Sequence, residues 1–333
     1  MLRLLTKILL LLLLLAGLGL AGGWWLVQRP VPMPDGPADF TVSPGSTARS
    51  VARVMQEAGI GVEPELFYWL ARLSGRAPQI KAGSYEIRDR VSTLALLDKL
   101  TAGDVSLREL RLTEGWTFAQ VQAAIAAHPD LVHDTADLAP AEILARIGAT
   151  ESHPEGLFFP DTYLFDLRSS DLDLYRRAYH EMKRRLEAAW AARPAGLPLE
   201  TPYEALILAS IIEKETGHPD DRTRVASVFA NRLRIGMRLQ TDPTVIYGIG
   251  PGFDGNLRRS DLERDTPYNT YTRAGLPPTP IAMPGQASID AALQPADTKY
   301  LYFVARGDGT SVFSNSLQEH NRAVARYQLR RSR

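Results

Sequence analysis

An uncharged apolar run near the start of the chain constrains its architecture more than any other feature. Ile8–Val27, ILLLLLLLAGLGLAGGWWLV, is a stretch of 20 residues without a charge. As a helix it is about 30 Å long, enough to cross the hydrocarbon core of a bilayer. We therefore expect one transmembrane helix over residues 8–27, preceded by a cytoplasmic tail (residues 1–7) and followed by a Pro-rich linker (residues 28–38).

The residues that flank this run set the expected orientation. Arg3 and Lys7 precede it and favour a cytoplasmic N-terminus, although Arg29 on the far side weakens the bias. Trp24 and Trp25 are typical of an interfacial anchor. A cleaved signal peptide is the alternative, but the run is longer than a usual signal-peptide core and has no clean small-x-small site. The rest of the chain is thus expected in the periplasm or at the cell exterior.

Charge and residue content exclude several classes of function. With 38 basic and 38 acidic residues the formal charge is zero, which argues against a nucleic-acid-binding protein. The absence of cysteine excludes disulfides and thiolate metal sites. The histidines show no zinc spacing, and GHPDD offers too few ligands for a metal, so we interpret it as a loop with Asp220 or Asp221 as N-cap of the next helix. We predict no metal and no cofactor.

Hydrophobic periodicity divides the remaining chain into two α+β domains. Residues 39–110 predict a small α+β module, and residues 111–333 predict a larger mixed α+β domain. The module is expected to contain a strand near 40–42, a helix capped by Ser46 or Thr47 and ending at Gly59, a helix over Pro64–Leu73, a strand over Gly83–Ile87, and a helix over Ser92–Leu100. The larger domain is expected to contain a strand before Thr113, a helix with Phe118 and Val121 on its stripe, an irregular aromatic wall at EGLFFPDTYLFD, and a long helix over Leu172–Ala191.

Two glutamates end the apolar stretch LASIIEKETG. We predict a helix over about Pro202–Thr216, whose apolar middle ALILASII indicates burial in the domain centre. At about 100° per residue Glu215 falls on the face of Leu208, whereas Glu213 points about 160° away from Glu215. A carboxyl group among apolar neighbours is harder to ionise, so its pKa rises and it can hold a proton near neutral pH. This favours Glu215 as a general acid.

Spacing alone also allows both glutamates to lie at an exposed helix end, paired with Lys214, Arg222 or Arg224. A polar and aromatic series downstream favours the catalytic interpretation. Aromatic rings and amides are suited to stacking on sugar faces and bonding hydroxyl and N-acetyl groups. The candidate substrate-binding residues are Gln240, Asp242, Tyr247, Tyr268, Asn269 and Tyr271.

Two acidic residues keep alternative interpretations. Asp242 either lines the cleft and orients the sugar or caps the turn before Pro243. Glu213 is interpreted as structural, with a backbone amide or an arginine as its partner.

Several motifs in order carry a family resemblance. They are KAGSY, a stretch of the EG-FFPDTY type, ASIIEKET, VASVFANRLRIGMRLQTDPTVIYG, YNTYTRAGLPPTPIAMPG, YLYFVA and the final HN. Over nearly the whole chain the sequence resembles the endolytic murein transglycosylases, YceG-like inner-membrane proteins of bacteria. One departure is ETGHPDD, which lacks a clear polar sugar ligand after the glutamate.

The resemblance implies a function. The expected reaction is cleavage of the peptidoglycan glycan strand between N-acetylmuramic acid and N-acetylglucosamine, within the strand, leaving a 1,6-anhydromuramic end. Residues 39–110 are expected to be LysM-like, and the second glutamate of EKE, Glu215, is expected to be catalytic, with Thr216 after it. Penicillin-binding proteins that synthesise peptidoglycan are the implied partners, at the periplasmic face of the inner membrane.

Two alternatives to this function stay open. A muramidase that hydrolyses the strand would need two carboxylates, with Asp242 as the second, whereas a transglycosylase can use Glu215 alone. A non-catalytic scaffold that holds glycan strands near the synthetic machinery is the other alternative.

Overall fold

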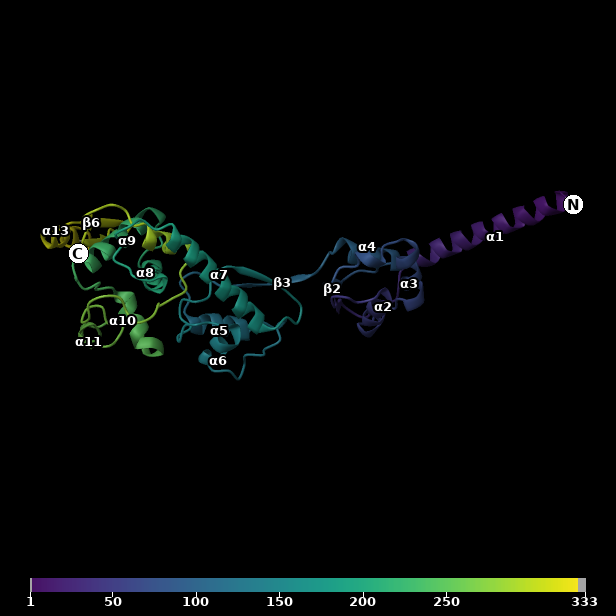
Figure 1. Ribbon diagram of the computed structural model, residues 1–333. Coiled ribbons are helices and arrows are strands. Elements are labelled where there is room, and N and C mark those ends of the chain that lie inside the picture. Colours follow the sequence, from purple (N-terminus) through teal and green to yellow (C-terminus); the bar gives the residue numbers. More distant parts are fainter. Residues whose placement is uncertain (1, 329–333) are drawn as a thin grey trace. The chain divides into compact units, whose positions relative to one another are not determined.

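The computed structural model describes residues 2–328, with side chains from residue 5 onward (Figure 1). Met1 and residues 329–333, which belong to the predicted tail and to the predicted larger domain, lie outside the described residues. The chain forms two compact units. The first comprises the chain up to Arg108 together with Leu164–Arg168, and the second comprises Glu109–Tyr163 and the chain from Ser169 onward. The fold is a mixed α+β fold, as predicted.

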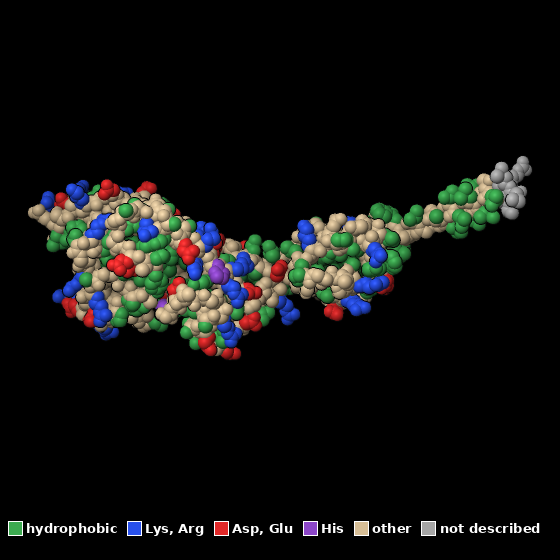
Figure 2. All heavy atoms as spheres, in the orientation of Figure 1, with side chains coloured by type: hydrophobic (Ala, Val, Ile, Leu, Met, Phe, Trp, Pro, Cys, Tyr) green, Lys and Arg blue, Asp and Glu red, His purple; other side chains and the backbone are tan. Residues whose placement is uncertain are grey.

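The N-terminal helix α1 (Leu2–Gln28) is longer than the predicted span. It begins at Leu2, so residues expected to form a tail are helical, because Leu and Lys are good helix formers and nothing interrupts them. Its segment Leu5–Gln28 is long and apolar enough to cross a membrane. Figure 2 shows mostly hydrophobic side chains along it. This fits a single-pass anchor, although a signal sequence meets the same criteria.

The rest of the first unit is a small α+β module. Its elements are β1 (Ala38–Val42), α2 (Ala48–Glu57), α3 (Pro64–Leu73), the 3₁₀ turn η1 (Ala77–Gln79), β2 (Gly83–Ile87) and α4 (Thr93–Ala102). β1 and β2 pair antiparallel with Phe40 opposite Tyr85, and these two rings stack in the core with Met55 and Leu97. Thr47, one of the two residues predicted as N-cap, caps α2. The LysM-like identity of this module stays a prediction.

The second unit is mostly helical. Its elements, together with strands shared at its boundary, are β3 (Leu107–Arg111), α5 (Phe118–Ala126), α6 (Pro140–Ile147), β4 (Thr162–Asp166), α7 (Asp171–Ala191), α8 (Pro202–Glu215), α9 (Pro219–Arg234), α10 (Asp242–Ile249), η2 (Gly250–Gly252), α11 (Arg259–Glu263), α12 (Gln286–Leu293), β5 (Tyr302–Ala305), β6 (Ser311–Ser314) and α13 (Leu317–Tyr327). β3 pairs with β4, and β5 pairs antiparallel with β6.

Two local predictions about this unit need correction. The predicted irregular wall is irregular and buried over residues 154–160, but Thr162–Asp166 forms β4, because its side chains alternate between exposed and buried. Neither Asp220 nor Asp221 is the N-cap of α9. His218 takes that position, Pro219 begins the helix, and the two acids lie in the first turn, where they complement the helix dipole.

Helix α8 lies at the centre of the second unit. It packs against α7, α9, α10 and α12, and Figure 1 shows α7, α9 and α10 around it. The run Ala205–Ile212 is buried without interruption, as its apolar sequence predicts. Ser210, in the middle of this run, is satisfied because it donates to the carbonyl of Ile207 and accepts from the amide of Ile281 at 3.0 Å. The core therefore fixes the position of the helix end that carries Glu215.

Candidate functional site

Glu215 is the last residue of α8 and opens onto a cavity of about 540 Å³. The chain leaves the helix at Thr216, whose backbone is extended, so the side chain of Glu215 lies at the boundary between core and cavity. The cavity is lined by residues of α8, α9, α10, α13, β5 and the segments between them, among them Glu215, Arg232, Gln240, Asp242, Tyr271, Tyr302 and His320. Four of the seven predicted site residues thus meet here.

A hydroxyl group donates to the carboxyl group of Glu215. Thr241 Oγ1 donates a short hydrogen bond to Glu215 Oε1. Thr241 is itself held on both sides, since its amide donates to Thr270 Oγ1 at 3.0 Å and its carbonyl accepts from Thr244 Oγ1 at 2.8 Å. The hydroxyl is therefore oriented by a network of threonines before any substrate arrives.

The environment raises the pKa of the Glu215 carboxyl group to near neutral pH. Burial raises the pKa of the Glu215 carboxyl to about 7, and the negative charge of Asp242 acts in the same direction. The hydrogen bond from Thr241 and the positive charge of Arg232 oppose this shift. A carboxyl group with a pKa near the working pH can both donate and accept a proton.

Asp242 and Gln240 form the wall next to Glu215. Asp242 is the first residue of α10, and Tyr271 Oη donates to its Oδ1 at 2.5 Å. Thr241, and not Asp242, occupies the N-cap position. Gln240 has φ +51°, a left-handed conformation that is uncommon for a residue with a side chain and is held by a bond from its amide to the carbonyl of Thr270.

A second wall was missed by the sequence analysis. Arg232 is 7% exposed, and its guanidinium donates to the carbonyls of Leu301 and Leu239, both at 2.7 Å. The same guanidinium lies over the ring of Tyr302, and His320 stacks on that ring at 5.2 Å between centroids. Burial lowers the pKa of Arg232 and of His320. His320 Nδ1 is buried without a hydrogen-bond partner within residues 2–328.

A helical pattern could have identified Arg232. It follows Val225, Val228 and Phe229 at spacings of three and four, which places it on the buried face of α9. A charged residue on an apolar face indicates either an ion pair or a site. His320 lies in a mostly polar helix, where no comparable pattern marks it.

The other three predicted residues do not line the cavity. Asn269 is 1% exposed, its Nδ2 donates to the carbonyls of Asp261, Leu262 and Arg264, and its Oδ1 accepts from the amide of Tyr271 at 2.9 Å. Both ends of the Asn269 side-chain amide are therefore bonded to backbone groups of the protein. Its contact with substrate stays a prediction.

Tyr247 and Tyr268 form an aromatic pair away from the lining of the cavity. Their rings meet edge to face with centroids 4.9 Å apart. Tyr268 Oη bonds to Thr279 Oγ1 at 2.9 Å, and Tyr247 Oη donates to Glu155 Oε2 at 3.0 Å. Each hydroxyl therefore already has a partner within the protein.

Glu155 is a second carboxyl group with a raised pKa, and the sequence analysis did not single it out. It is 3% exposed, and its Oε1 accepts from the amide of Phe118 at 2.9 Å. Burial raises the pKa of the Glu155 carboxyl to about 7, against the hydrogen bonds from Phe118 and Tyr247. An acid before a glycine in the stretch EGLFF is a weak signal, which explains why it was overlooked.

The first glutamate of EKE has a structural partner. Glu213 Oε2 accepts from the amide of Gly285 at 3.0 Å, which is one of the two partners predicted for it. Lys214 donates to the carbonyl of Gly115, and Arg224 pairs with Asp221 at 2.9 Å. The structure thus places these two cations on other acceptors, so it gives no support to the interpretation of an exposed, ion-paired helix end.

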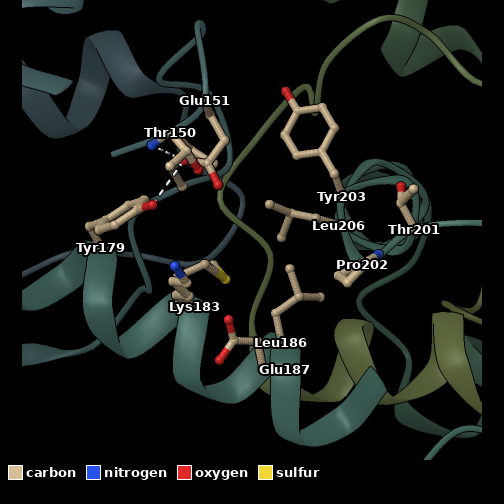
Figure 3. A pocket seen from close by; sticks show the side chains of 12 residues that line it. Thr150, Glu151, Tyr179, Lys183, Leu186, Glu187, Thr201, Pro202, Tyr203 and Leu206 are labelled. Carbon is tan, nitrogen blue, oxygen red and sulfur yellow. Dashed lines mark hydrogen bonds between the residues drawn. The ribbon is translucent and has the colours of Figure 1, made fainter. Parts of the chain in front are cut away.

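A second pocket lies near the other end of α8. It has a volume of about 240 Å³ and is lined by Glu151, Tyr179, Lys183, Tyr203, Leu206 and their neighbours (Figure 3). Figure 3 shows Glu151 accepting from Tyr179 Oη, at 2.9 Å. None of the predicted site residues lines this pocket. Leu206 and Glu215 are nine residues apart, about 13 Å along the helix, so this pocket is separate from the Glu215 cavity.

Comparisons with known proteins identify relatives of this chain. The endolytic murein transglycosylase of Bacillus subtilis (strain 168) is 31% identical over 313 residues, 87% of this chain and 84% of the relative. The endolytic murein transglycosylase of Streptococcus pneumoniae serotype 2 (strain D39 / NCTC 7466) is 27% identical over 320 residues, 85% of this chain and 57% of the relative. The chain thus spans little more than half of the streptococcal protein.

A solved structure and a family profile extend the comparison. The crystal structure of a YceG-like protein from Listeria monocytogenes matches with a TM-score of 0.55 and 29% identity, and covers 87% of this chain and 100% of that one. The profile of the YceG-like family matches residues 40–326, which include β2, α8 and every residue placed in the cavity above. The chain therefore belongs to the YceG-like family.

Proposed function

We propose that this chain is a lytic transglycosylase that cleaves peptidoglycan glycan strands internally, between N-acetylmuramic acid and N-acetylglucosamine, and leaves a 1,6-anhydromuramic end. The observation that carries the proposal is Glu215, a carboxyl group with a pKa of about 7 that opens onto a cavity and has an oriented hydroxyl on one oxygen. The names of the bacillary and streptococcal relatives support the substrate class.

The proposed reaction needs Glu215 to give up a proton and then to take one back. Protonated Glu215 gives its proton to the glycosidic oxygen while the bond from that oxygen to C1 of muramic acid breaks. The C6 hydroxyl oxygen of the same sugar then bonds to C1, and its proton passes to the Glu215 carboxylate. The carboxyl group is restored and no water is consumed, so a second carboxylate is not required.

The residues around Glu215 fit both halves of this cycle. Asp242 raises the pKa of Glu215, which favours the acid form needed first, and its negative charge favours the positive charge that develops at the anomeric carbon. Arg232 lowers the pKa of Glu215 and so stabilises the carboxylate that exists between the two proton transfers. Gln240 and Tyr271, on the same cavity wall, are proposed to bind the sugar.

Product analysis tests the proposal. Purified full-length protein and a Glu215→Gln variant would be incubated with isolated glycan strands, and products would be identified by mass spectrometry. We expect anhydro products, lighter by one water than reducing-end products, from the wild type and none from the variant. Reducing ends that disappear with Asp242→Asn would support the hydrolase instead. Glycan binding without either product would support the non-catalytic scaffold.

The setting of the reaction is part of the proposal. With α1 as an inner-membrane anchor, the cavity would face the periplasm, where the enzyme would trim or terminate nascent strands beside peptidoglycan synthases of the penicillin-binding class. The apolar character of α1 supports the anchor. Fractionation of membranes, followed by N-terminal sequencing of the mature chain, distinguishes an anchor from a cleaved signal peptide.

A further inference from the structure

We infer that Glu155 and Tyr247 form a positioning pair that holds α10 in the orientation in which Thr241 reaches Glu215. The inference rests on the proposed function for the role of Glu215 in catalysis, and it adds two residues that do not line the cavity. Both act through α10 and neither is proposed to touch the substrate.

Glu155 joins two helices through its two oxygens. Oε1 accepts from the amide of Phe118, the first residue of α5, and Oε2 accepts from the Tyr247 hydroxyl on α10. A carboxylate can accept from two directions at once, whereas a glutamine side chain has a single acceptor oxygen. This geometry accounts for a glutamate at a buried position where an ionisable group is otherwise unfavourable.

The turn that carries Glu155 has little freedom to move. Gly156 has φ +80°, and a Cβ built on it would lie 2.4 Å from Cβ of Pro280. Only glycine accommodates both the left-handed backbone and this close approach. The segment 154–160 is buried throughout. Glu155 is therefore a fixed point from which Tyr247 can be held.

Helix α10 connects this fixed point to the cavity. It has eight residues and is about 12 Å long, so it moves as one rigid piece. Thr241 immediately precedes it, Asp242 begins it, and Tyr247 lies near its far end. Gly248 packs closely, since a Cβ there would lie 3.1 Å from Cβ of Tyr268. A tilt at the Tyr247 end would displace Thr241 and Asp242 relative to Glu215.

The protonation of Glu215 gives a direct readout of this displacement. Its surroundings comprise Thr241 and Asp242 at the start of α10, Arg232 on α9, and Tyr271 on the following segment. The hydrogen bond from Thr241 lowers the pKa of Glu215 more strongly than the charge of Asp242 raises it, so a displacement that removes both effects raises that pKa. A variant that only weakens packing would not raise it.

The test compares Glu155→Gln and Tyr247→Phe with Thr241→Val. Carbodiimide labelling of detergent-solubilised full chain, mapped by peptide mass at a series of pH values, reports the protonation of Glu215 without requiring activity. We expect all three variants to shift the labelling curve to higher pH. We also expect kcat on glycan strands to fall about tenfold in the first two, with KM unchanged. The double variant Thr241→Val, Tyr247→Phe should shift the curve no further than Thr241→Val alone.

Tyr268→Phe is the matched control, because it removes the hydroxyl of the neighbouring ring that bonds to Thr279 and not to Glu155. It should leave the labelling curve and kcat as in the wild type. The inference is overturned if Tyr247→Phe, folded by circular dichroism, has wild-type labelling and kcat, or if Tyr268→Phe shifts both equally. Absence of lytic activity in the wild type would refute the proposed function, whereas the labelling comparison would still decide the positioning role.

Discussion

Two regions of the second unit each hold a glutamate whose pKa is raised to about 7, and they differ in access. Glu215 opens onto a cavity of about 540 Å³, whereas Glu155 is 3% exposed and has both oxygens bonded to the protein. Burial is the largest cause of the raised pKa in both. A raised pKa therefore identifies groups removed from water, and only the presence of a cavity separates a proton donor from a structural acceptor.

Removing the acid at each position gives the largest predicted difference. Glu215→Gln should lower kcat on glycan strands by about 10³-fold, because the general acid is lost. Glu155→Gln should lower it only about tenfold, through the displacement of α10. Initial rates of product release at pH 6, with circular dichroism as the control for folding, compare the two. Equal losses in both variants would contradict the distinction between an accessible and a sealed carboxyl group.

The same two groups should make the folded state less stable as pH rises. The folded-state pKa of about 7 lies above the ordinary value of 4.5, so the folded chain binds more protons than the unfolded chain between these values. The stability contributed by the protonated groups is present below pH 4.5 and is lost as pH rises through 7, by roughly 3 kcal/mol per group. Thermal unfolding at several pH values measures this loss.

Single variants separate the two contributions to this pH dependence. Glu155→Gln and Glu215→Gln should each flatten the decline in Tm between pH 5 and 7. Tyr268→Phe, which retains both carboxyl groups, should leave it as in the wild type. A decline that neither glutamine substitution alters would mean that other groups cause it.

The contrast between a sealed and an accessible side chain extends to two side-chain amides, those of Asn269 and Gln240. Asn269→Ala should lower the free energy of unfolding by about 2 kcal/mol, because three backbone carbonyls of the α11 region lose the donor that the buried Asn269 supplies. Gln240→Asn, which shortens a cavity side chain and tolerates the left-handed backbone, should instead raise KM with stability nearly unchanged. Urea unfolding and initial-rate measurements on both variants test this difference. A raised KM in folded Asn269→Ala would support the predicted contact of Asn269 with substrate.

Sequence periodicity predicted the elements better than it predicted the site. The apolar run of α8 and the face of Glu215 follow from helical geometry alone, and the strand over Gly83–Ile87 agrees to the residue. The site also depends on where side chains of distant segments meet. Tyr247 and Tyr271 read alike in sequence, yet Tyr271 bonds to Asp242 in the cavity and Tyr247 bonds to the sealed Glu155. Only the packing of α10 separates them.

Asp242 gives the smallest predicted effect and the sharpest test of how many carboxyl groups the reaction needs. Its charge raises the pKa of Glu215, so Asp242→Asn should lower that pKa and move the alkaline limb of kcat/KM to lower pH. Activity at pH 6 should fall by no more than about tenfold, since a transglycosylase does not use a second carboxylate.

Tyr271→Phe is the matched control for Asp242→Asn. It removes the hydroxyl that bonds to Asp242 but leaves the charge, so it should not lower the pKa of Glu215 in this way. Loss of all activity in folded Asp242→Asn, with products that carry an added water in the wild type, would make Asp242 the second catalytic carboxylate. In that outcome two acids in the cavity, Glu215 and Asp242, would both react. The contrast in catalytic role would then be between these two residues and no longer between Glu215 and Glu155.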